Sequence, residues 1–313
     1  MLDHLYQILK LLRPRQWIKN VALFAAITFA GQLFNFNLLE QVILGVIAFS
    51  FLSSSTYIIN DILDVRKDKL HPFKRLRPIA SGKISISEAT AIFLLMITVS
   101  FVLATKIGGL FFLITSLYIV LQIFYSLLFK SAVIFDILFI ATGYILRVLA
   151  GEVISGYHIS VWLLLTTISL SLFLAVGKRR SELTLLRNFN GAKIEEVRKS
   201  LSHYSSHLLD SFAAIFATST FIFYSMFTFL ENPSGIKINL DLLLPDFLPY
   251  YLQRKWLMIT IFPVIYGLMK YLQDIYEKSE GESPDRVLLS DKSLLGSVLV
   301  WGILVIFVIY FMR

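Results

Sequence analysis

The stretch Asn60-Asp61-Ile62-Leu63-Asp64-Val65-Arg66-Lys67-Asp68 lies where a long apolar run meets a dense cluster of charge. On a helix, at 100° per residue, its three aspartates project from one face over roughly 10 Å of helix axis. Carboxylates that close repel each other unless a cation neutralises them. Mg²⁺ suits hard oxygen ligands of this kind and also binds substrate phosphates. The same spacing is also consistent with a solvated acidic helix end, in which the aspartates pair with the neighbouring lysines and arginine.

The composition places this stretch in a membrane protein. Of the 313 residues, 57% are hydrophobic and 16% are charged, and the mean hydropathy is +0.73. Soluble domains carry about 25% charged residues. Cysteine is absent, which excludes a disulfide framework and a thiolate site. The net charge of +8 would suggest nucleic acid in a soluble chain, but the distribution of charge here follows a membrane topology, and no nucleic-acid partner is expected.

Apolar stretches long enough to cross a bilayer alternate with charged connections along the whole chain. The expected fold is all-α: a single integral-membrane domain over residues 1–313, with about nine transmembrane helices and long motif loops at about 61–87 and 178–207. The spans are expected at about 17–34, 38–60, 88–106, 109–129, 132–153, 158–177, 208–231, 256–276 and 293–312.

The positive charges fall mainly on one side of these spans. Of the 29 lysines and arginines, 23 lie in the N-terminal segment and in the connections after the even-numbered spans. Loops rich in Lys and Arg stay in the cytoplasm. The N-terminus and the aspartate stretch are therefore expected at the cytoplasmic face.

The loop after the aspartates is basic and rigid. Lys74, Arg75 and Arg77 follow within a few residues, while Pro72 and Pro78 stop helix continuation. A basic loop beside a carboxylate cluster indicates a site for a phosphorylated substrate, with metal and guanidinium groups sharing the negative charge. Topology alone also accounts for a basic cytoplasmic loop.

Asp136 and Arg147 lie inside the fifth span, where each costs at least ~2.5 kcal/mol if it faces lipid. Roughly 16 Å of helix rise prevents them from pairing with each other. Either they form ion pairs with other helices or they line a water-filled cavity. A transporter using both residues is a weaker alternative, because transporters often carry internal repeats or interrupted helices and neither is clear in this sequence.

Further cations stand at span ends. The segment that enters the first span, from Arg13 to Asn20, has the composition of an interfacial anchor, and its Lys19 lies deep enough to reach a buried anion. Span six ends in Lys178-Arg179-Arg180-Ser181-Glu182, which is also typical of a cytoplasmic anchor.

The pattern N-D-x-x-D-x-x-x-D at residues 60–68, followed by R-P-I-x-x-G at residues 77–82, resembles the UbiA-type intramembrane prenyltransferase superfamily. The resemblance implies a helical bundle around a central cavity that opens sideways to lipid. It also implies an enzyme of the bacterial inner membrane whose cytoplasmic mouth binds a diphosphate held by Mg²⁺.

Within that superfamily, residues 13–183 are most similar to the branch that transfers phosphoribose to a polyprenyl phosphate. The similarity lies in residues 13–20, 60–75, 125–130, 136, 143–151 and 177–183. Prenyltransferases carry a second aspartate-rich motif near the end of span six. A basic cluster with one carboxylate cannot assemble that second magnesium cage, but it can bind a monophosphate.

The resemblance therefore implies phosphoribosyl pyrophosphate as donor, decaprenyl or another polyprenyl phosphate as acceptor, and membrane lipid around both. Asp61, Asp64 and Asp68 are expected to hold Mg²⁺, and Asn60 to orient a ligand. The expected substrate-binding residues are Lys19, Lys74, Arg75, Arg77, Tyr125, Lys130, Asp136, Arg147, Lys178, Arg179 and Glu182. The alternative activity is prenyl transfer from a polyprenyl diphosphate to an aromatic or other small acceptor.

Overall fold

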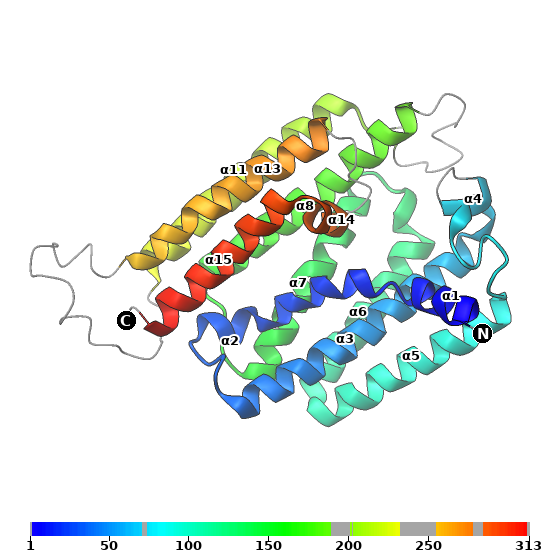
Figure 1. Cartoon of the computed structure of the whole chain (residues 1–313), viewed down its shortest axis with the longest axis horizontal. Coiled ribbons are helices and arrows are strands. Elements are labelled where there is room, and N and C mark those ends of the chain that lie inside the picture. Colours follow the sequence, from blue (N-terminus) through cyan, green and yellow to red (C-terminus); the bar gives the residue numbers. More distant parts are fainter. Residues whose placement is uncertain are drawn as a thin grey trace, which may run out of the picture.

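A computed structural model describes residues 2–70, 74–188, 201, 203–231, 255–277 and 284–311. Every regular element in these ranges is a helix (Figure 1). The elements are α1 Leu2–Leu12, η1 Pro14–Phe24, α2 Ala25–Phe29, α3 Phe36–Leu63, α4 Val65–Leu70, η2 Lys74–Leu76, α5 Ile86–Ile107, α6 Gly109–Leu127, η3 Phe129–Ser131, α7 Phe135–Ser155, α8 Val161–Asn188, α11 Ser206–Leu230, η5 Trp256–Thr260, α13 Ile261–Glu277, α14 Pro284–Ser290 and α15 Lys292–Phe311.

Eight helices of the described chain are long and apolar enough to cross a membrane. The first expected span is built differently, as the 3₁₀ helix η1 followed by the short helix α2. At about 2.0 Å per 3₁₀ residue and 1.5 Å per α residue, this pair extends about 30 Å, which is the thickness of the hydrocarbon core. The all-α polytopic fold is confirmed, and the count of nine stays a prediction.

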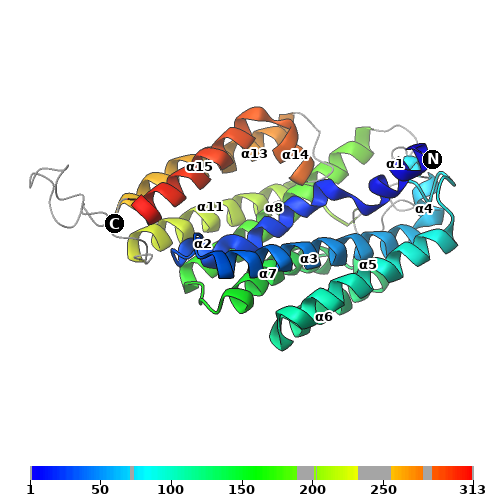
Figure 2. The ribbon, with the colours of Figure 1, turned by 60° about the horizontal axis from the view of Figure 1, so that its bottom comes forward.

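Helix α3 is the central element. In its apolar window 61% of the residues are buried, against 11% in α5, which faces outward. The serines 53–55 of α3 are all buried and let neighbouring segments approach closely. Ser54 accepts a hydrogen bond from Trp17 Nε1 at 3.0 Å and donates to the Leu12 carbonyl at 2.8 Å. The N-terminal segment is thereby attached along α3, as Figure 2 shows.

Helix α7 joins two apolar cores. On one side, Phe49, Phe111 and Tyr118 form a core with α3, α5 and α6. On the other side, Phe173, Leu209 and Tyr271 form a core with α8, α11 and α13. Helix α7 contributes Leu146 and Ala150 to the first core and Ile137 to the second. Polar side chains on α7 are therefore held between the two halves of the bundle.

The two ends of the bundle differ in character. Helices α1 and α4 lie together at one end, and α2 and the end of α15 lie at the other (Figures 1 and 2). At the first end, Gly82 has a φ of 76°, so a turn forms there as its type suggests. The tight connection between α5 and α6 likewise depends on Gly108, whose φ is 154°.

The boundaries differ from the expected ones at both motif loops. Helix α8 continues to Asn188, so the basic residues 178–180 are helical and do not begin a loop. Of the expected loop 178–207, residues 189–200 and 202 lie outside the described residues. Helix α3 continues through Leu63, three residues beyond the expected end of the span.

Candidate active site

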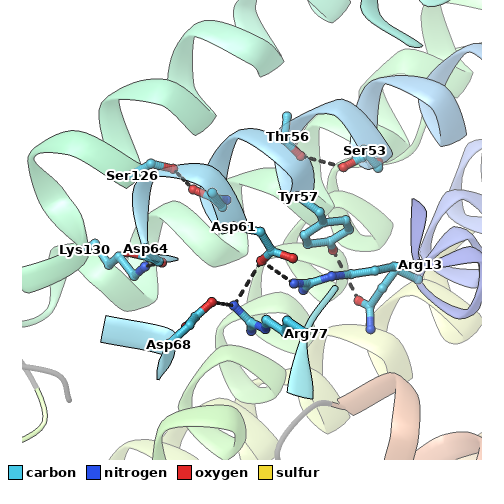
Figure 3. Close-up of polar contacts among 12 residues, drawn as sticks. Arg13, Ser53, Thr56, Tyr57, Asp61, Asp64, Asp68, Arg77, Ser126 and Lys130 are labelled. Atoms are coloured by element: carbon cyan, nitrogen blue, oxygen red, sulfur yellow. Dashed lines mark hydrogen bonds and ion pairs between the residues drawn. The ribbon is translucent and has the colours of Figure 1, made fainter. Parts of the chain in front are cut away.

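The aspartate motif, residues 60–68, is divided between two helices. Helix α3 ends at Leu63, Asp64 is its C-cap with φ −92° and ψ 2°, and α4 begins at Val65. The single helical face expected for the three carboxylates is therefore not found. Because the chain bends at Asp64, the carboxylates of Asp61 and Asp68 meet on one side, and that of Asp64 turns toward Lys130 (Figure 3).

Two arginines from distant segments hold the first pair of carboxylates. Asp61 Oδ1 accepts from Arg13 Nη2 at 2.5 Å and from Arg77 Nη1 at 3.0 Å. The same Arg77 nitrogen donates to Asp68 Oδ2 at 2.7 Å. Asp61 is 2% exposed and Asp68 is 4% exposed. Burial raises the pKa of Asp68 above its usual value, although the positive charge of Arg77 opposes the shift.

The other half of the motif is tied to the end of α6. Lys130, in η3, forms an ion pair with Asp64 Oδ2. Ser126, in the last turn of α6, donates a hydrogen bond to Asn60 Oδ1. Asn60 and the three aspartates of the motif therefore each have a side-chain partner from another part of the chain.

The donor set fits Mg²⁺, although no group of three or more histidine, aspartate or glutamate side chains within the described ranges is arranged to hold a metal ion. Carboxylate and amide oxygens are the ligands that Mg²⁺ takes. Asp61 and Asp68 already direct one oxygen each at the same cationic nitrogen. Asp61, Asp68 and, beside them, Asp64 are the residues of this chain that would hold the ion.

A row of polar side chains leads from the aspartate motif toward the basic end of α8. The Arg13 guanidinium lies 4.9 Å from the ring centre of Tyr57. The Tyr57 hydroxyl donates to Gln16 Oε1 at 3.2 Å, and Lys19 Nζ donates to the same oxygen at 2.5 Å. Lys19 in turn lies close enough to Lys178 for their charges to interact. Both charged motifs therefore face one polar region.

Within the basic segment, residues 178–182, Arg179 is the one cation that is completely buried. Its nitrogens contact Asp136 Oδ2 at 2.8 Å, Glu182 Oε2 at 2.6 Å and the Tyr125 hydroxyl at 3.1 Å. Four expected substrate-binding residues thus come together, but they bind one another. In the structure this group is a buried network that fixes the position of α8 relative to α6 and α7.

Lys178 has a different environment from its neighbour. It is half-buried, its charge interacts with Glu182, Tyr125 and Lys19, and it forms no hydrogen bond or ion pair within the part of the chain described. Arg180 points elsewhere and pairs with Asp210 at 2.7 Å. Lys178 is therefore the cation of this segment that is best placed to receive an anion.

Arg147 is buried between the two cores and binds neutral oxygens. It donates to Asn20 Oδ1 at 2.7 Å, to the Tyr118 hydroxyl at 2.9 Å and to Ser53 Oγ at 3.1 Å. Of the two alternatives for the fifth span, the ion pair is confirmed for Asp136. Arg147 has no carboxylate partner among the residues described.

The remaining expected residues lie in η2, beside the aspartate motif. Lys74 is half-buried and its charge acts on Asp68, whereas Arg75 is exposed. Two pockets in the described part of the chain lie elsewhere. One, of 570 Å³, is between α13 and α15, and one, of 260 Å³, is at the opposite end of the bundle beside His158. The central cavity stays an expectation.

Sequence reasoning missed three contributors to the site: Arg13, Ser126 and Tyr204. The pattern at Arg13 indicates only an interfacial anchor. In the structure Arg13 has a φ of 54°, which turns the chain just before η1, and its guanidinium reaches Asp61. Tyr204 is not among the expected site residues, yet its hydroxyl donates to Asp136 Oδ1 at 2.8 Å. Contacts between residues so far apart leave no local signal.

Comparison with known proteins defines the class. The model of the UbiA prenyltransferase family matches residues 21–180. Among solved structures, a UbiA homolog from Archaeoglobus fulgidus bound to GPP and Mg²⁺ has a TM-score of 0.68 at 19% identity, over 96% of this chain and 99% of that chain. An apo UbiA homolog from Aeropyrum pernix K1 has a TM-score of 0.57 at 14% identity, over 94% and 97%. These likenesses show the fold.

The chain belongs to the UbiA prenyltransferase family and is a multi-pass membrane transferase. It is 33% identical over 311 residues to the decaprenyl-phosphate phosphoribosyltransferase of Corynebacterium glutamicum, which covers 97% of this chain and 87% of that protein. It is 31% identical over 298 residues to the protein of the same name from Mycolicibacterium smegmatis, over 94% and 89%. The expected family is thus confirmed.

Proposed function

We propose that this chain transfers 5-phosphoribose from phosphoribosyl pyrophosphate to a polyprenyl phosphate such as decaprenyl phosphate, with Mg²⁺ and with release of pyrophosphate. The reaction takes place at the cytoplasmic face of a bacterial inner membrane. The observation that carries the proposal is the charge at the end of α8. Glu182, the single acid of that helix, is bound by Arg179, while the charge of Lys178 interacts with that of Lys19. A cation pair suits a monophosphate, and the two named relatives support the same reaction.

The donor binds at the aspartate motif in this proposal. Asp61, Asp64 and Asp68 hold Mg²⁺, and Asn60, oriented by Ser126, binds a ligand oxygen. When bound there, Mg²⁺ would supply positive charge that offsets the negative charge of the departing pyrophosphate. Arg77, Lys74 and Arg75 bind the remaining phosphate oxygens, because guanidinium and ammonium groups complement phosphate charge. Lys130 keeps Asp64 in place.

The acceptor binds at Lys19 and Lys178. A phosphate monoester oxygen is already anionic, so the chain needs no general base to activate it. That oxygen forms a bond to the ribose C1 as the bond between C1 and the pyrophosphate oxygen breaks, and the bonding pair leaves with pyrophosphate. Holding two anions against one carbon is the main catalytic task, since orientation alone can supply several kcal/mol, about 7–11 in favourable cases.

The test supplies purified protein with Mg²⁺, labelled phosphoribosyl pyrophosphate and decaprenyl phosphate, and follows label into the organic phase. We expect transfer that EDTA stops and added Mg²⁺ restores. Lys178→Met should raise the KM for the lipid, whereas Lys83→Met, an exposed lysine, should not.

Prenyl transfer is the second candidate, because the family carries that name and the solved neighbours include one bound to GPP. A parallel reaction therefore contains a polyprenyl diphosphate and an aromatic acceptor. Consumption of the diphosphate, with no label moving to decaprenyl phosphate, would overturn the proposal in favour of this candidate.

A further inference from the structure

The connection between η3 and α7 contains a strained turn. Ile134 has φ 69° and ψ −49°, and the N–H of Phe135 donates to the Val133 carbonyl at 2.8 Å. These values define a γ-turn with a positive φ, a rare and strained conformation. A positive φ is least favourable for β-branched residues such as isoleucine. Such strain persists only where surrounding contacts hold it in place.

Tyr204 supplies that contact from a distant part of the chain. Its hydroxyl accepts a hydrogen bond from the Ile134 N–H at 2.6 Å and donates one to Asp136 Oδ1 at 2.8 Å. The side chain is 3% exposed, and burial raises the pKa of Tyr204 above its usual value, so the hydroxyl keeps its proton. Asp136 is itself fixed by Arg179 at 2.8 Å, with both side chains fully buried. The strained turn is therefore attached to the most deeply buried ion pair of the site.

The turn determines where Lys130 lies. Lys130 belongs to η3, four residues before Ile134, and forms its ion pair with Asp64 across to the aspartate motif. On the other side of the turn, Phe139 of α7 stacks on Phe129 at 4.7 Å. A relaxed Ile134, with a negative φ, would change the direction of the chain between these two anchors. Lys130 would then no longer be held in the same place relative to Asp64.

We propose that Tyr204 is a positioning residue of the donor site: it holds the γ-turn at Ile134 and thereby keeps Lys130 on Asp64. The inference rests on the proposed function, because Asp64 and Lys130 belong to the donor site described there. Tyr204 contacts neither the aspartate motif nor Lys130 in any described interaction, so its effect passes through the backbone of residues 130–136.

The first test is Tyr204→Phe, which removes the hydroxyl alone. We expect the KM for phosphoribosyl pyrophosphate to rise about ten-fold, because about 1.4 kcal/mol corresponds to a factor of ten. The matched control is Tyr310→Phe. The Tyr310 hydroxyl is also buried and accepts a backbone hydrogen bond, from Leu33 at 2.7 Å, but at the opposite end of the bundle. We expect that control to lower the Tm and leave the KM unchanged.

The second test is rescue. Ile134→Gly in the Tyr204→Phe background should restore the KM, because glycine adopts a positive φ without strain. The Ile134 side chain is 49% exposed, so its removal costs little packing. In a Lys130→Met background, Tyr204→Phe should raise the KM no further, since its effect acts through Lys130.

The outcomes separate the two proposals. A wild-type KM in Tyr204→Phe with only a lowered Tm, or a rise that Ile134→Gly leaves unchanged, would overturn the positioning role. If the wild type transfers no phosphoribose but does transfer a prenyl group, the proposed function fails alone. In that case the KM for the polyprenyl diphosphate donor is measured in the same variants. If Tyr204→Phe leaves that KM unchanged, the positioning role is again overturned.

Discussion

At the scale of single residues, the buried charges of this protein are stabilised by partners from distant segments. Asp61 is almost inaccessible and is compensated by Arg13 and Arg77, which come from either side of it in the chain. Removing one member of such a group leaves an uncompensated charge, which is costlier than losing the whole group. Substitutions here affect both stability and function, so each test needs a matched control.

Asp61→Asn keeps the size of the side chain and removes its charge. We expect turnover to fall at least about 100- to 1000-fold, the usual cost of losing one preorganised electrostatic contact. Asp64→Asn should abolish turnover likewise. The loss is measured as label transferred per folded protein, with folding checked by gel filtration in detergent. Asp3→Asn, which alters an exposed carboxylate in α1, should retain full activity. Wild-type turnover in Asp61→Asn or Asp64→Asn would remove the metal-site assignment.

Arg147→Lys keeps the buried charge but provides fewer donors. The ammonium cannot reach Asn20, Ser53 and Tyr118 together, so at least one buried oxygen loses its partner. A lost buried hydrogen bond of this kind costs about 1–3 kcal/mol. We expect a lower midpoint of thermal unfolding in detergent. Arg15→Lys, at an exposed arginine, is the control and should leave the midpoint in place. Equal midpoints for both variants would show that the Arg147 contacts contribute no stability.

At the scale of elements, the position of α8 depends on a close contact with α13. A Cβ added at Gly177 would lie 2.7 Å from Ile275 Cδ1 and 2.9 Å from the Tyr271 hydroxyl. Gly177 directly precedes Lys178, and Arg179 lies one residue further on. The absence of a side chain at residue 177 therefore lets α13 support the segment that carries the basic cluster.

Gly177→Ala should consequently destabilise the protein by about 1–3 kcal/mol through overpacking. The measurement is thermal unfolding in detergent. Gly296→Ala is the control, because a Cβ added there meets no atom within 4 Å. It should be neutral or stabilising, since alanine favours a helix. If Ile275→Val, which removes the atom at 2.7 Å, fails to recover any stability in Gly177→Ala, the clash with α13 is not the cause.

At the scale of the whole molecule, the charged site occupies one end of the bundle, and the pocket beside His158 lies at the other. The bias of lysines and arginines predicts that the first end is cytoplasmic. The chain has no cysteine, so single cysteines can be introduced without background labelling.

Lys83→Cys and His158→Cys test the orientation. Both positions are exposed, Lys83 near the aspartate motif and His158 at the opposite end. We expect a membrane-impermeant maleimide to label His158→Cys in intact cells and to label Lys83→Cys only after the membrane is opened. Labelling of both positions from one side would show that the expected topology is wrong.

Much of the architecture followed from the sequence because each signal is local. Hydropathy over about 20 residues predicts a spanning helix wherever lipid surrounds it. The aspartate motif and the basic loop indicated a phosphate site, since like charges that close need a counter-charge.

The packing of the helices sets which charges meet. Composition and periodicity are properties of short segments, and they predict a polytopic helical membrane protein with an acidic motif and a basic one. It did not predict that Arg13 would reach Asp61, that Asp136 would bind Arg179, or that Tyr204 would hold the turn at Ile134. These contacts join residues separated by dozens of positions, and only the packing of whole helices sets such distances.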